Sequence, residues 1–548
     1  MSARQPVWLG IDVGTGSARA GAFAADGRLL GAAKRDIRVW RERADIVEQS
    51  SDDIWAASCT AAQGALAAAS VGSDAVRGLS FDATCSMAVL DRRMRPLAAG
   101  PSGDRQRNVI VWMDHRAVEQ ARRINATGDA VLDYMGGTIS PEMQTPKLLW
   151  LKEHMPAAYA AAGHFLDLAD YLTWRATGSL ARSVCTVTCK WTYLAHERRW
   201  SDAYFRRIGL GDIAEEGYAR IGVEIVDPGT PLGAGLTAAA SRDLGLQPGT
   251  PVGAGLIDAH AGGVGSIGGA GRDGGAVDPL RRIAFIMGTS NCTMAVAAEP
   301  RFVPGVWGPY FSAMIPGLWL AEGGQSAGGA AIDHLVRLHP AHRQAAEQSA
   351  GRGLSLLAGL EGEALARGGD AASAALLARD VHVLPEFLGN RSPFADPHAR
   401  AALAGLALDD SRDSLVRLYV AGLCGLGCGA AQILRALAAS GYELTSIVIS
   451  GGASRSALVR QITADATGLD VVVPETAEPV LLGAAMLGAI AAGAFPDLSA
   501  AMAAMARDGG TIRPAGGRIA AFHAAKRMVF EELQSLDRGS RERMAAFA

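Results

Sequence analysis

The start of the chain alternates between short apolar runs and turns rich in glycine and hydroxyl side chains. Val7–Asp12 is predicted to be a strand, and Ser17–Phe23 can pair back on it. Asp26-Gly27 is a strong hairpin-turn signal, which introduces a third strand at Arg28–Lys34. This order predicts an antiparallel meander rather than the strand, turn and helix of a Walker-type nucleotide loop.

The periodicity then changes between helix and strand. Asp52–Ala69 is predicted to be helical, and the short apolar run Val76–Phe81 is predicted to be a buried strand that Met87–Leu90 extends. Further helices are expected at residues 115–124, 147–154 and 202–207.

The opening pattern of strand, turn and strand returns near the middle of the chain. Gly249–Gly275 is rich in glycine and alanine, and it is predicted to be a loop-to-helix segment followed by a flexible connection. Arg282–Met287 is then predicted to be a strand, Gly288-Thr289-Ser290 a turn, and Asn291–Ala297 a second strand. The recurrence predicts two α/β domains, residues 1–270 and 271–548, with related cores that face a shared cleft.

A third glycine-rich strand end lies late in the chain. Ile447–Ser450 is predicted to be a strand that breaks at Gly451-Gly452, where a ligand could approach the backbone closely. A helix is expected at Ser456–Thr467, a short strand at Val471–Val473 and another helix at residues 483–491. Residues 480–495 are apolar but too few to span a bilayer, so they predict a buried, tightly packed helix.

Composition narrows the class of protein. The chain has 548 residues, with 49% apolar and 20% charged residues, which favours a globular protein of at least two domains. The net charge of −3 gives no strong field for nucleic acid or membrane, so neither is expected as a partner. The segment MSARQPVWLGID has no apolar core of a signal peptide, so a cytoplasmic location is expected.

The seven cysteines are sparse and odd in number, which argues against a disulfide framework. Cys185/Cys189 and Cys424/Cys428 are both spaced C-x₃-C, which raises the question of zinc. Neither pair has the tighter spacing or the nearby histidine pattern of a zinc site. Buried thiols are therefore the favoured interpretation.

Two acidic positions could carry chemistry. The turn Gly14-Thr15-Gly16-Ser17 offers N–H groups and hydroxyls that suit phosphate oxygens, and Asp12 beside it suits Mg²⁺. The alternative for this turn is an ordinary capped hairpin. Asp258, in the stretch GLIDAHAG, could accept a proton from a substrate hydroxyl, and its alternative is a helix N-cap.

Other nucleotide-binding motifs are excluded or weak. Residues 263–268 satisfy GxGxxG, but no strand is predicted immediately before them, so a dinucleotide fold is not favoured. GxxxxGK[ST] is absent from the sequence, which excludes a P-loop.

Six motifs in order carry a family resemblance. They are IDVGTGSARA, WMDHRA, KLLWLKEH, AGLIDAHAG, MGTSN and GGASRSALVRQITADATG, and they extend from the first strand to the last third of the chain. Together they resemble the FGGY carbohydrate kinases, which have the actin-like ATPase fold. The sequence departs from the family pattern at Gln144, where a small residue or proline is usual, and at Ser456, where asparagine is more frequent.

The resemblance implies an α/β fold of two actin-like (ribonuclease H-like) domains with a cleft between them, and ATP and Mg²⁺ as the nucleotide and the metal. Asp258 is then the base that takes the sugar hydroxyl proton, and Asp12 helps to place the metal. The residues that the resemblance assigns to the nucleotide are Gly14, Thr15, Gly16, Ser17, Gly288, Thr289, Ser290, Gln325, Gly451, Gly452 and Ser456.

The sugar side resembles the ribulokinases. Cys189-Lys190-Trp191 is similar to their lysine segment, the turn at Glu322 to their acidic sugar-binding turn, and residues 81–86 to a stretch typical of the D-ribulokinase branch, although Met87-Ala88 replaces the usual Leu-Val. The alternative for Lys190 and Glu322 is a surface ion or a solvated side chain. The predicted sugar contacts are Asp82, Ala83, Thr84, Asp114, Lys190, Asp258 and Glu322.

The resemblance predicts ATP-dependent phosphorylation of a ketopentose, with D-ribulose giving D-ribulose 5-phosphate. The alternatives are L-ribulose, D-xylulose or ribitol as the acceptor, or a non-catalytic actin-like nucleotide-binding protein. A homodimer is a further expectation, since the partly amphipathic tail after about residue 500 fits either packing on the core or a dimer contact.

Overall fold

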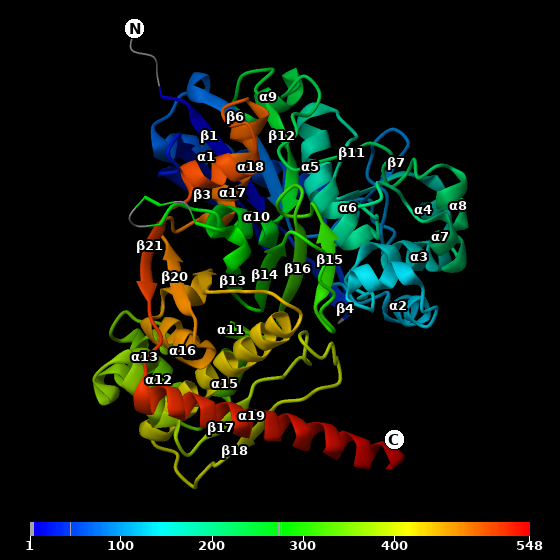
Figure 1. Cartoon of the computed structure of the whole chain (residues 1–548). Coiled ribbons are helices and arrows are strands. Elements are labelled where there is room, and N and C mark those ends of the chain that lie inside the picture. Colours follow the sequence, from blue (N-terminus) through cyan, green and yellow to red (C-terminus); the bar gives the residue numbers. More distant parts are fainter. Residues whose placement is uncertain (1–4, 44, 272–273, 276, 548) are drawn as a thin grey trace.

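The computed structural model describes residues 5–43, 45–271, 274–275 and 277–547. Its first large sheet has the strand order β12-β6-β1-β2-β3 (Figure 1). β1, β6 and β12 are parallel, whereas β1, β2 and β3 form an antiparallel meander, which confirms the prediction for the start of the chain. The bounds are Val7–Val13 for β1, Ser17–Ala24 for β2, Leu29–Asp36 for β3, Val76–Ala83 for β6 and Val252–Ile257 for β12.

The second large sheet repeats this arrangement with more strands, in the order β15-β16-β14-β13-β19-β20-β21. β13 pairs antiparallel with β14 and parallel with β19, as β1 does with β2 and β6. The predicted recurrence is therefore confirmed. The bounds are Arg282–Met287 for β13, Asn291–Ala297 for β14, Trp307–Phe311 for β15, Trp319–Gln325 for β16, Ser446–Ser450 for β19, Asp470–Pro474 for β20 and Asp508–Ile512 for β21.

Two helices, α10 (Asp258–Ile267) and α17 (Pro479–Ala491), pack closely on each other. A Cβ atom on Gly265 would lie 1.9 Å from the Pro479 carbonyl oxygen, and one on Gly483 would lie 2.0 Å from that of Ala261. Only glycine permits this approach of two backbones. The prediction of a buried, tightly packed helix is thus confirmed for α17.

α17 belongs to the second half of the sequence but packs on β1 and β6 of the first sheet. α10 contacts β13 of the second sheet as well as α17, so these two helices join the two halves. The predicted boundary between residues 270 and 271 follows α10 closely and stays a prediction.

One sequence prediction in this region was wrong. Residues 252–257 were expected to be part of a loop, but they form the buried strand β12. A Cβ atom on Gly253 would lie 2.6 Å from the Leu487 carbonyl oxygen, so small residues are needed where α17 crosses the strand. Glycine and alanine here report close packing rather than a flexible loop.

The first sheet is covered on its other side by α1 (Ser51–Ala69), which contacts β2 and β3, and by α5 (Leu168–Thr177), which contacts β6 and β12. α1 begins after Ser50, whose hydroxyl accepts a hydrogen bond from the Asp53 N–H, and it carries two acidic residues in its first turn. The two-residue strands β10 (Arg182–Ser183) and β11 (Ile225–Val226) and the helix α9 (Ala238–Leu244) complete this part.

A separate lobe extends from the first sheet at the right of Figure 1. It contains a smaller sheet in the order β4-β5-β8-β7-β9 and several short helices. The strands are Trp40–Arg43 (β4), Ile46–Gln49 (β5), Met87–Asp91 (β7), Val109–Ile110 (β8) and Ala162–Asp167 (β9). The helices are Val118–Asn125 (α2), Gln144–His154 (α3), Pro156–Ala161 (α4), Val184–Trp191 (α6), Asp202–Arg207 (α7) and Gly211–Glu215 (α8).

The second sheet is flanked by helices of the C-terminal half, of which α15 (Arg412–Ala439) is the longest apolar one. By length and composition α15 could cross a membrane, but 78% of its most apolar window is buried inside the protein, where it packs on α11 and α16. The other helices are Gly329–Arg337 (α11), His342–Ala350 (α12), Leu356–Gly368 (α13), Ala371–Ala374 (α14) and Ala457–Thr467 (α16).

The tail after about residue 500 packs on the core over much of its length. α18 (Leu498–Met505) contacts α17, β21 joins the second sheet beside β20, and α19 (Gly517–Met544) packs on α15 and α16. The last turns of α19 extend beyond the neighbouring elements in Figure 1. A role of this tail in a homodimer stays a prediction.

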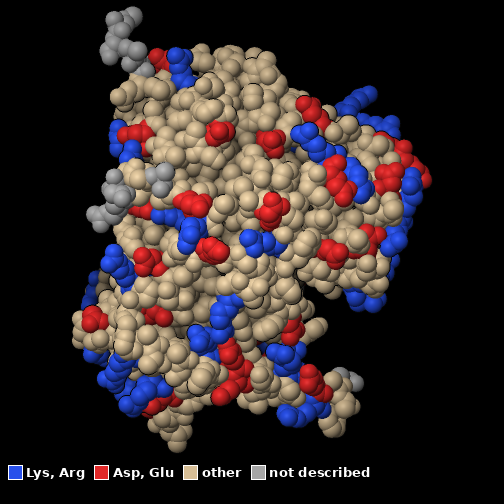
Figure 2. Space-filling view, in the orientation of Figure 1, with Lys and Arg blue, Asp and Glu red and all other residues tan. Residues whose placement is uncertain are grey.

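The face drawn in Figure 2 carries Lys and Arg interspersed with Asp and Glu, without a broad patch of one sign. The same view shows the molecule hollowed between the lobe that contains the β4-β5-β8-β7-β9 sheet and the C-terminal end of α19. The mixed charge on this face agrees with the small net charge of the sequence.

Candidate active site

Three carboxylates meet at one edge of the first sheet. Asp12 on β1 and Asp82 on β6 are register partners, and Asp82 also pairs in register with Leu256 on β12. Asp258 is the second residue after Leu256 and the first of α10. Because the carboxyl ends of parallel strands share one edge of a sheet, the fold gathers three acids that are far apart in the sequence.

The first two of these acids, Asp12 and Asp82, are almost wholly buried, and among the described residues only Asp12 has a charged partner at hydrogen-bond distance. Asp12 is 2% exposed, and its Oδ2 accepts a 2.8 Å hydrogen bond from Nε of Arg19. Arg19 also forms a 2.8 Å ion pair with Glu478, which precedes α17. Asp82 is fully buried, and among the described residues neither of its oxygens has a hydrogen-bond partner.

This deficit of partners points to a cation. Burial, followed by the negative charge of Asp12, raises the pKa of Asp82 well above its usual range. A buried carboxylate without a partner is costly unless a positive group satisfies it. Mg²⁺ prefers such oxygen ligands and is commonly held by one or two carboxylates plus substrate phosphates. The residues present therefore fit a magnesium ion at Asp12, with Asp82 beside it.

Asp258 has the environment of a proton acceptor. Burial, followed by the charge of Asp12, raises its pKa to about 6, while the Ala259 N–H donates a 2.7 Å hydrogen bond to its Oδ1. Ile257 occupies the N-cap position of α10, so the alternative reading of Asp258 as the N-cap does not describe this helix. A carboxylate with a pKa near 6 is mostly ionised at neutral pH yet basic enough to accept a proton.

The first glycine-rich turn joins β1 to β2 and is held by its own backbone. The Gly14 N–H donates to the Ser17 carbonyl over 3.0 Å. Thr15 is fixed from the lobe, since Trp112 Nε1 donates to its hydroxyl over 2.9 Å. A Cβ atom on Gly16 would meet nothing within 4 Å, so the turn faces open space that can admit a phosphate.

The second turn joins β13 to β14 in the same way, with the Gly288 N–H donating to the Ser290 carbonyl over 3.0 Å. The start of α11 lies behind it, because the Gly328 and Gly329 N–H groups donate to the Thr289 and Gly288 carbonyls, each over 2.8 Å. Gly288 and Thr289 remain exposed. The N–H and hydroxyl groups of Thr289 are of the kind that bind phosphate oxygens.

The third glycine-rich strand end lies next to the second turn. Gly451 directly follows β19, which pairs in parallel with β13, and it has a φ of 88°. A Cβ atom there would lie 2.4 Å from the Met287 carbonyl oxygen, so both the conformation and the packing require glycine. A Cβ atom on Gly452, by contrast, would meet nothing within 4 Å.

Ser456, Asp114 and Gln325 are predicted ligand residues whose side chains bond to other residues of the protein. Ser456 is the N-cap of α16 and donates to Glu361 over 2.8 Å. Asp114 is fully buried, accepts from the Val47 N–H over 2.6 Å and forms a 2.7 Å ion pair with Arg116. Their predicted contacts with nucleotide and sugar stay predictions.

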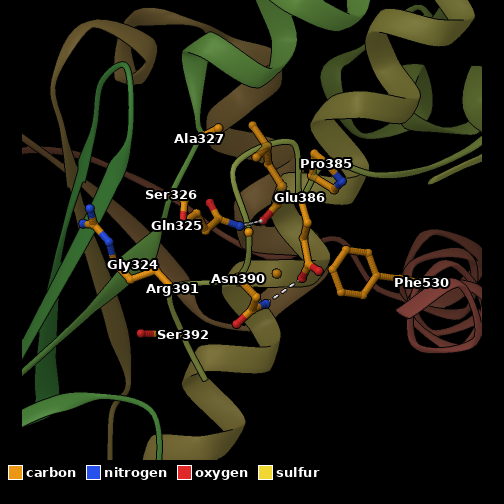
Figure 3. A pocket seen from close by; sticks show the side chains of 13 residues that line it. Gly324, Gln325, Ser326, Ala327, Pro385, Glu386, Asn390, Arg391, Ser392 and Phe530 are labelled. Atoms are coloured by element: carbon orange, nitrogen blue, oxygen red, sulfur yellow. Dashed lines mark hydrogen bonds between the residues drawn. The ribbon is translucent and has the colours of Figure 1, made fainter. Parts of the chain in front are cut away.

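Gln325 is the third of these residues and lines a small cavity of about 30 Å³ between the end of β16, residues 385–392 and Phe530 (Figure 3). Its Oε1 accepts from Asn291 Nδ2 over 2.7 Å, and its Nε2 donates to the Leu426 carbonyl over 2.9 Å. A cavity of this size holds about one or two water molecules. Gln325 therefore ties β14 to α15 here, and its contact with the nucleotide stays a prediction.

The predicted sugar residues Lys190 and Glu322 come together as a buried ion pair. Lys190 is in the last turn of α6 and Glu322 is on β16, and their Nζ and Oε2 atoms are 3.5 Å apart. Both are less than 10% exposed, which excludes the alternative of solvated surface side chains. The charge of Lys190 also acts on Asp258, whose pKa it lowers, so this pair lies near the three carboxylates.

Ala83 and Thr84 continue β6 past Asp82. Ala83 is fully buried and in register with Val13 and Ile257 on the two neighbouring strands. The Thr84 N–H donates to the Val13 carbonyl over 2.9 Å, and its hydroxyl shares a 3.0 Å hydrogen bond with Ser86. These residues shape the sheet edge beside Asp82.

Sequence reasoning missed two residues that enclose the ion pair. Trp307 on β15 has Lys190 Nζ 4.8 Å and the Arg391 guanidinium 5.3 Å from its ring centroid. The charge of Arg391 also helps to keep the pKa of Glu322 low. Both residues lie in segments without a short motif, so no signal in the sequence placed them beside residues 190 and 322.

Comparison with known proteins decides the family. Residues 7–265 match the N-terminal domain of the FGGY family of carbohydrate kinases, and residues 283–492 match its C-terminal domain. The chain belongs to the FGGY family of carbohydrate kinases. It therefore has the two-domain actin-like fold of these enzymes, which confirms the family and the fold class predicted from the sequence, and the family acts as sugar kinases with ATP as the phosphate donor.

Individual FGGY proteins are similar over nearly the whole chain. An FGGY carbohydrate kinase domain-containing protein of Danio rerio is 46% identical over 532 residues, which cover 96% of this chain and 97% of that protein. The D-ribulokinase of Saccharomyces cerevisiae is 35% identical over 517 residues, which cover 89% and 72%. The crystal structure of xylulose kinase from Rhodospirillum rubrum has a TM-score of 0.76 at 21% identity and 99% coverage of both chains, which shows a common fold.

Proposed function

We propose that this FGGY kinase transfers the γ-phosphoryl group of ATP to the terminal hydroxyl of a ketopentose, with D-ribulose as the preferred acceptor and D-ribulose 5-phosphate as the product. The observation that carries the proposal is the gathering of Asp12, Asp82 and Asp258 at one sheet edge near the Lys190–Glu322 pair. The similarity to a yeast D-ribulokinase over most of the chain supports this choice of sugar.

The chemistry that this chain must supply is positioning and one proton transfer. Asp258 accepts the proton of the sugar hydroxyl while the hydroxyl oxygen of the sugar forms a bond to the γ-phosphorus. The bond between that phosphorus and the β–γ bridging oxygen breaks, which releases ADP. Mg²⁺, when bound at Asp12, neutralises charge on the phosphate oxygens. The turns at residues 14–17 and 288–290 offer N–H and hydroxyl groups to the phosphate chain.

The sugar is selected by paired charges that are already buried. Lys190 can donate to a sugar oxygen, and Glu322 can accept from a sugar hydroxyl. An acceptor that lacks a hydroxyl, or presents it on the other side, would leave one of these groups without a partner. Trp307, whose ring lies against Lys190, offers an apolar surface on which the sugar carbons can pack.

The experiment is release of ADP in the presence of MgATP with D-ribulose, L-ribulose, D-xylulose, L-xylulose, ribitol and glycerol. Strong turnover with D-ribulose alone is expected. Preference for another member would overturn the sugar assignment and leave the kinase chemistry in place. No turnover with any member, although MgATP still binds, would count against the proposed reaction. The Asp258→Asn variant, purified in parallel, reports contaminating kinase activity.

A further inference from the structure

A buried thiol and a buried imidazole meet directly behind the sugar-binding carboxylate. Cys185 on α6 and His260 on α10 are both fully buried, with Sγ and Nδ1 3.0 Å apart. The Ile257 N–H points at the same sulfur over 3.4 Å. Cys189, one helical turn after Cys185, also bonds to Sγ of Cys185. Three donors therefore converge on one sulfur atom, which is the environment of a thiolate.

The charges of the pair agree with this geometry. Burial alone would raise the pKa of Cys185, but the hydrogen bond from Cys189 and the charge of His260 lower it to about 5. Burial would lower the pKa of His260, but Cys185 and Glu322 raise it to about 9. At neutral pH the pair is thus a thiolate and an imidazolium ion.

The other nitrogen of His260 reaches the sugar site. Its Nε2 is 3.4 Å from Oε2 of Glu322, the same oxygen that Lys190 approaches to 3.5 Å. Charge therefore alternates along the row of Cys185, His260, Glu322 and Lys190. Both cations act on Oε2, and within the described residues no hydrogen bond occupies Oε1, which leaves this oxygen for a ligand hydroxyl.

We propose that Cys185 and His260 are a positioning pair that fixes the carboxylate of Glu322 for sugar binding. The thiolate keeps His260 protonated, and the protonated ring holds Oε2 so that Oε1 is presented to the sugar. This inference rests on the proposed function, since it assigns the pair a role at the sugar site of that reaction. His260 is also two residues after Asp258, so the pair ties the start of α10 to α6.

A metal site is the competing interpretation, because ligand atoms of Cys185, Cys189 and His260 all lie within 4.8 Å of one another. Bond lengths of about 2.3 Å for zinc to sulfur and about 2.0 Å for zinc to nitrogen keep two tetrahedral ligands roughly 3.5 Å apart. The 3.0 Å separation of Sγ and Nδ1 is a direct hydrogen bond instead. The charged and titratable groups around the pair are Cys189, Lys190, Asp258, Glu322, Asp167 and Asp170.

The chain offers a matched control. Cys424 and Cys428 on α15 have the same C-x₃-C spacing and are also buried, but burial raises the pKa of each to about 12, so they are neutral thiols. Cys185→Ser and Cys424→Ser therefore make the same chemical change in two buried helices. Cys185→Asp restores a negative charge, and thermal melting of each variant reports whether it is folded.

The first measurement does not depend on which sugar is used. The ultraviolet absorbance of a thiolate is expected to appear with a midpoint near pH 5 in the wild type, to persist in Cys424→Ser and to be lost in Cys185→Ser. Absence of this titration in the folded wild type would overturn the proposal. One equivalent of zinc that is lost in Cys189→Ser would overturn it in favour of the metal site.

The second measurement uses whichever sugar supports turnover. A wrong assignment of D-ribulose can therefore be distinguished from failure of the present proposal. Cys185→Ser is expected to raise the KM for the sugar about tenfold with less change in kcat, since one charge-assisted contact is weakened. Cys185→Asp is expected to recover part of this loss. An equal rise in Cys424→Ser, or no rise in Cys185→Ser, would overturn the proposal.

The pH dependence of sugar binding separates charge from packing. In the wild type, binding measured by calorimetry should weaken as pH rises through about 9, where His260 loses its proton. Cys185→Ser removes the anion that raises the pKa of His260, so this weakening should move towards neutral pH. If sugar binding to a folded Cys185→Ser variant weakens at the same alkaline pH as in the wild type, the proposed role of the thiolate would be overturned.

Discussion

The two strand–turn–strand units of the molecule share one backbone and differ in their charges. In the first, Asp12 on β1 faces Arg19 on β2 in register. If the Gly-Thr pairs of the two turns are aligned, the corresponding pair in the second unit is Ile286 and Cys292, which also face each other in register. An ion pair in one half therefore corresponds to an uncharged pair in the other.

The next strand of each sheet continues this difference. β6 places Asp82 beside Asp12, whereas β19 places Ser450 beside Ile286. In the proposed reaction the first half thus supplies the carboxylates for the metal ion and for the proton, whereas the turn of the second half supplies neutral N–H and hydroxyl groups. Two units of the same topology can therefore contact a phosphate chain from both sides, while the carboxylates proposed to take part in the reaction come from the first half only.

The largest effect on this difference between the halves is expected from removal of the proposed proton acceptor, Asp258. Asp258→Asn is expected to lower kcat about 10²–10⁴-fold, the usual contribution of a general base. Sugar affinity should change much less, because the amide keeps the shape of the side chain. Steady-state kinetics together with calorimetric titration of the sugar test this. Turnover close to that of the wild type would remove Asp258 from the role of base.

The second largest effect is expected from loss of the proposed metal ligand, Asp12. Asp12→Asn is expected to lower kcat/KM for MgATP about 100-fold and to raise the Mg²⁺ concentration needed for half-maximal activity, since an anionic ligand is lost. Ile286→Val at the corresponding position of the second unit should leave the magnesium dependence unchanged. Equal effects of the two variants would mean that the halves do not differ as the structure indicates.

A smaller effect, on stability, is expected from changing the side-chain amide of Gln325 in the second half. Gln325→Leu removes the partner of Asn291 Nδ2 and of the Leu426 carbonyl, and it should lower the free energy of unfolding by about 1–3 kcal/mol. Urea denaturation measures this. Gln344→Leu at an exposed position of α12 is the control, with an expected change within about 0.5 kcal/mol. An unchanged midpoint for Gln325→Leu would contradict the structural role of this amide.

The finest test is a pH shift. Asp258 must be ionised to accept a proton, so kcat/KM for the sugar should rise as pH increases through about 6. The negative charge of Asp12 contributes to this raised pKa, so the acid limb of Asp12→Asn should move to lower pH. Ile286→Val should leave the limb in place. A limb that moves to higher pH in Asp12→Asn would contradict the coupling of the two carboxylates.

Much of the site was predictable because its parts are local. The turns at residues 14–17 and 288–290 can be predicted because glycine and hydroxyl residues follow an apolar run. Asp258 can be predicted because it is an acidic residue in a segment of small residues. The strand at residues 252–257 was missed for a related reason. Its glycines and alanines looked like a loop, but they are small because α17 crosses them, and only the packing of two distant segments reveals this.

The sequence by itself determined the order of strands and turns, the recurrence in the two halves and the family, since these depend on periodicity and on motifs of a few residues. The tertiary structure alone decided which acids share an edge, which predicted ligands have internal partners, and that Cys185 and His260 meet behind Glu322. Proximity of residues 75 positions apart depends on strand order and helix packing, and the pKa of a buried group depends on that proximity.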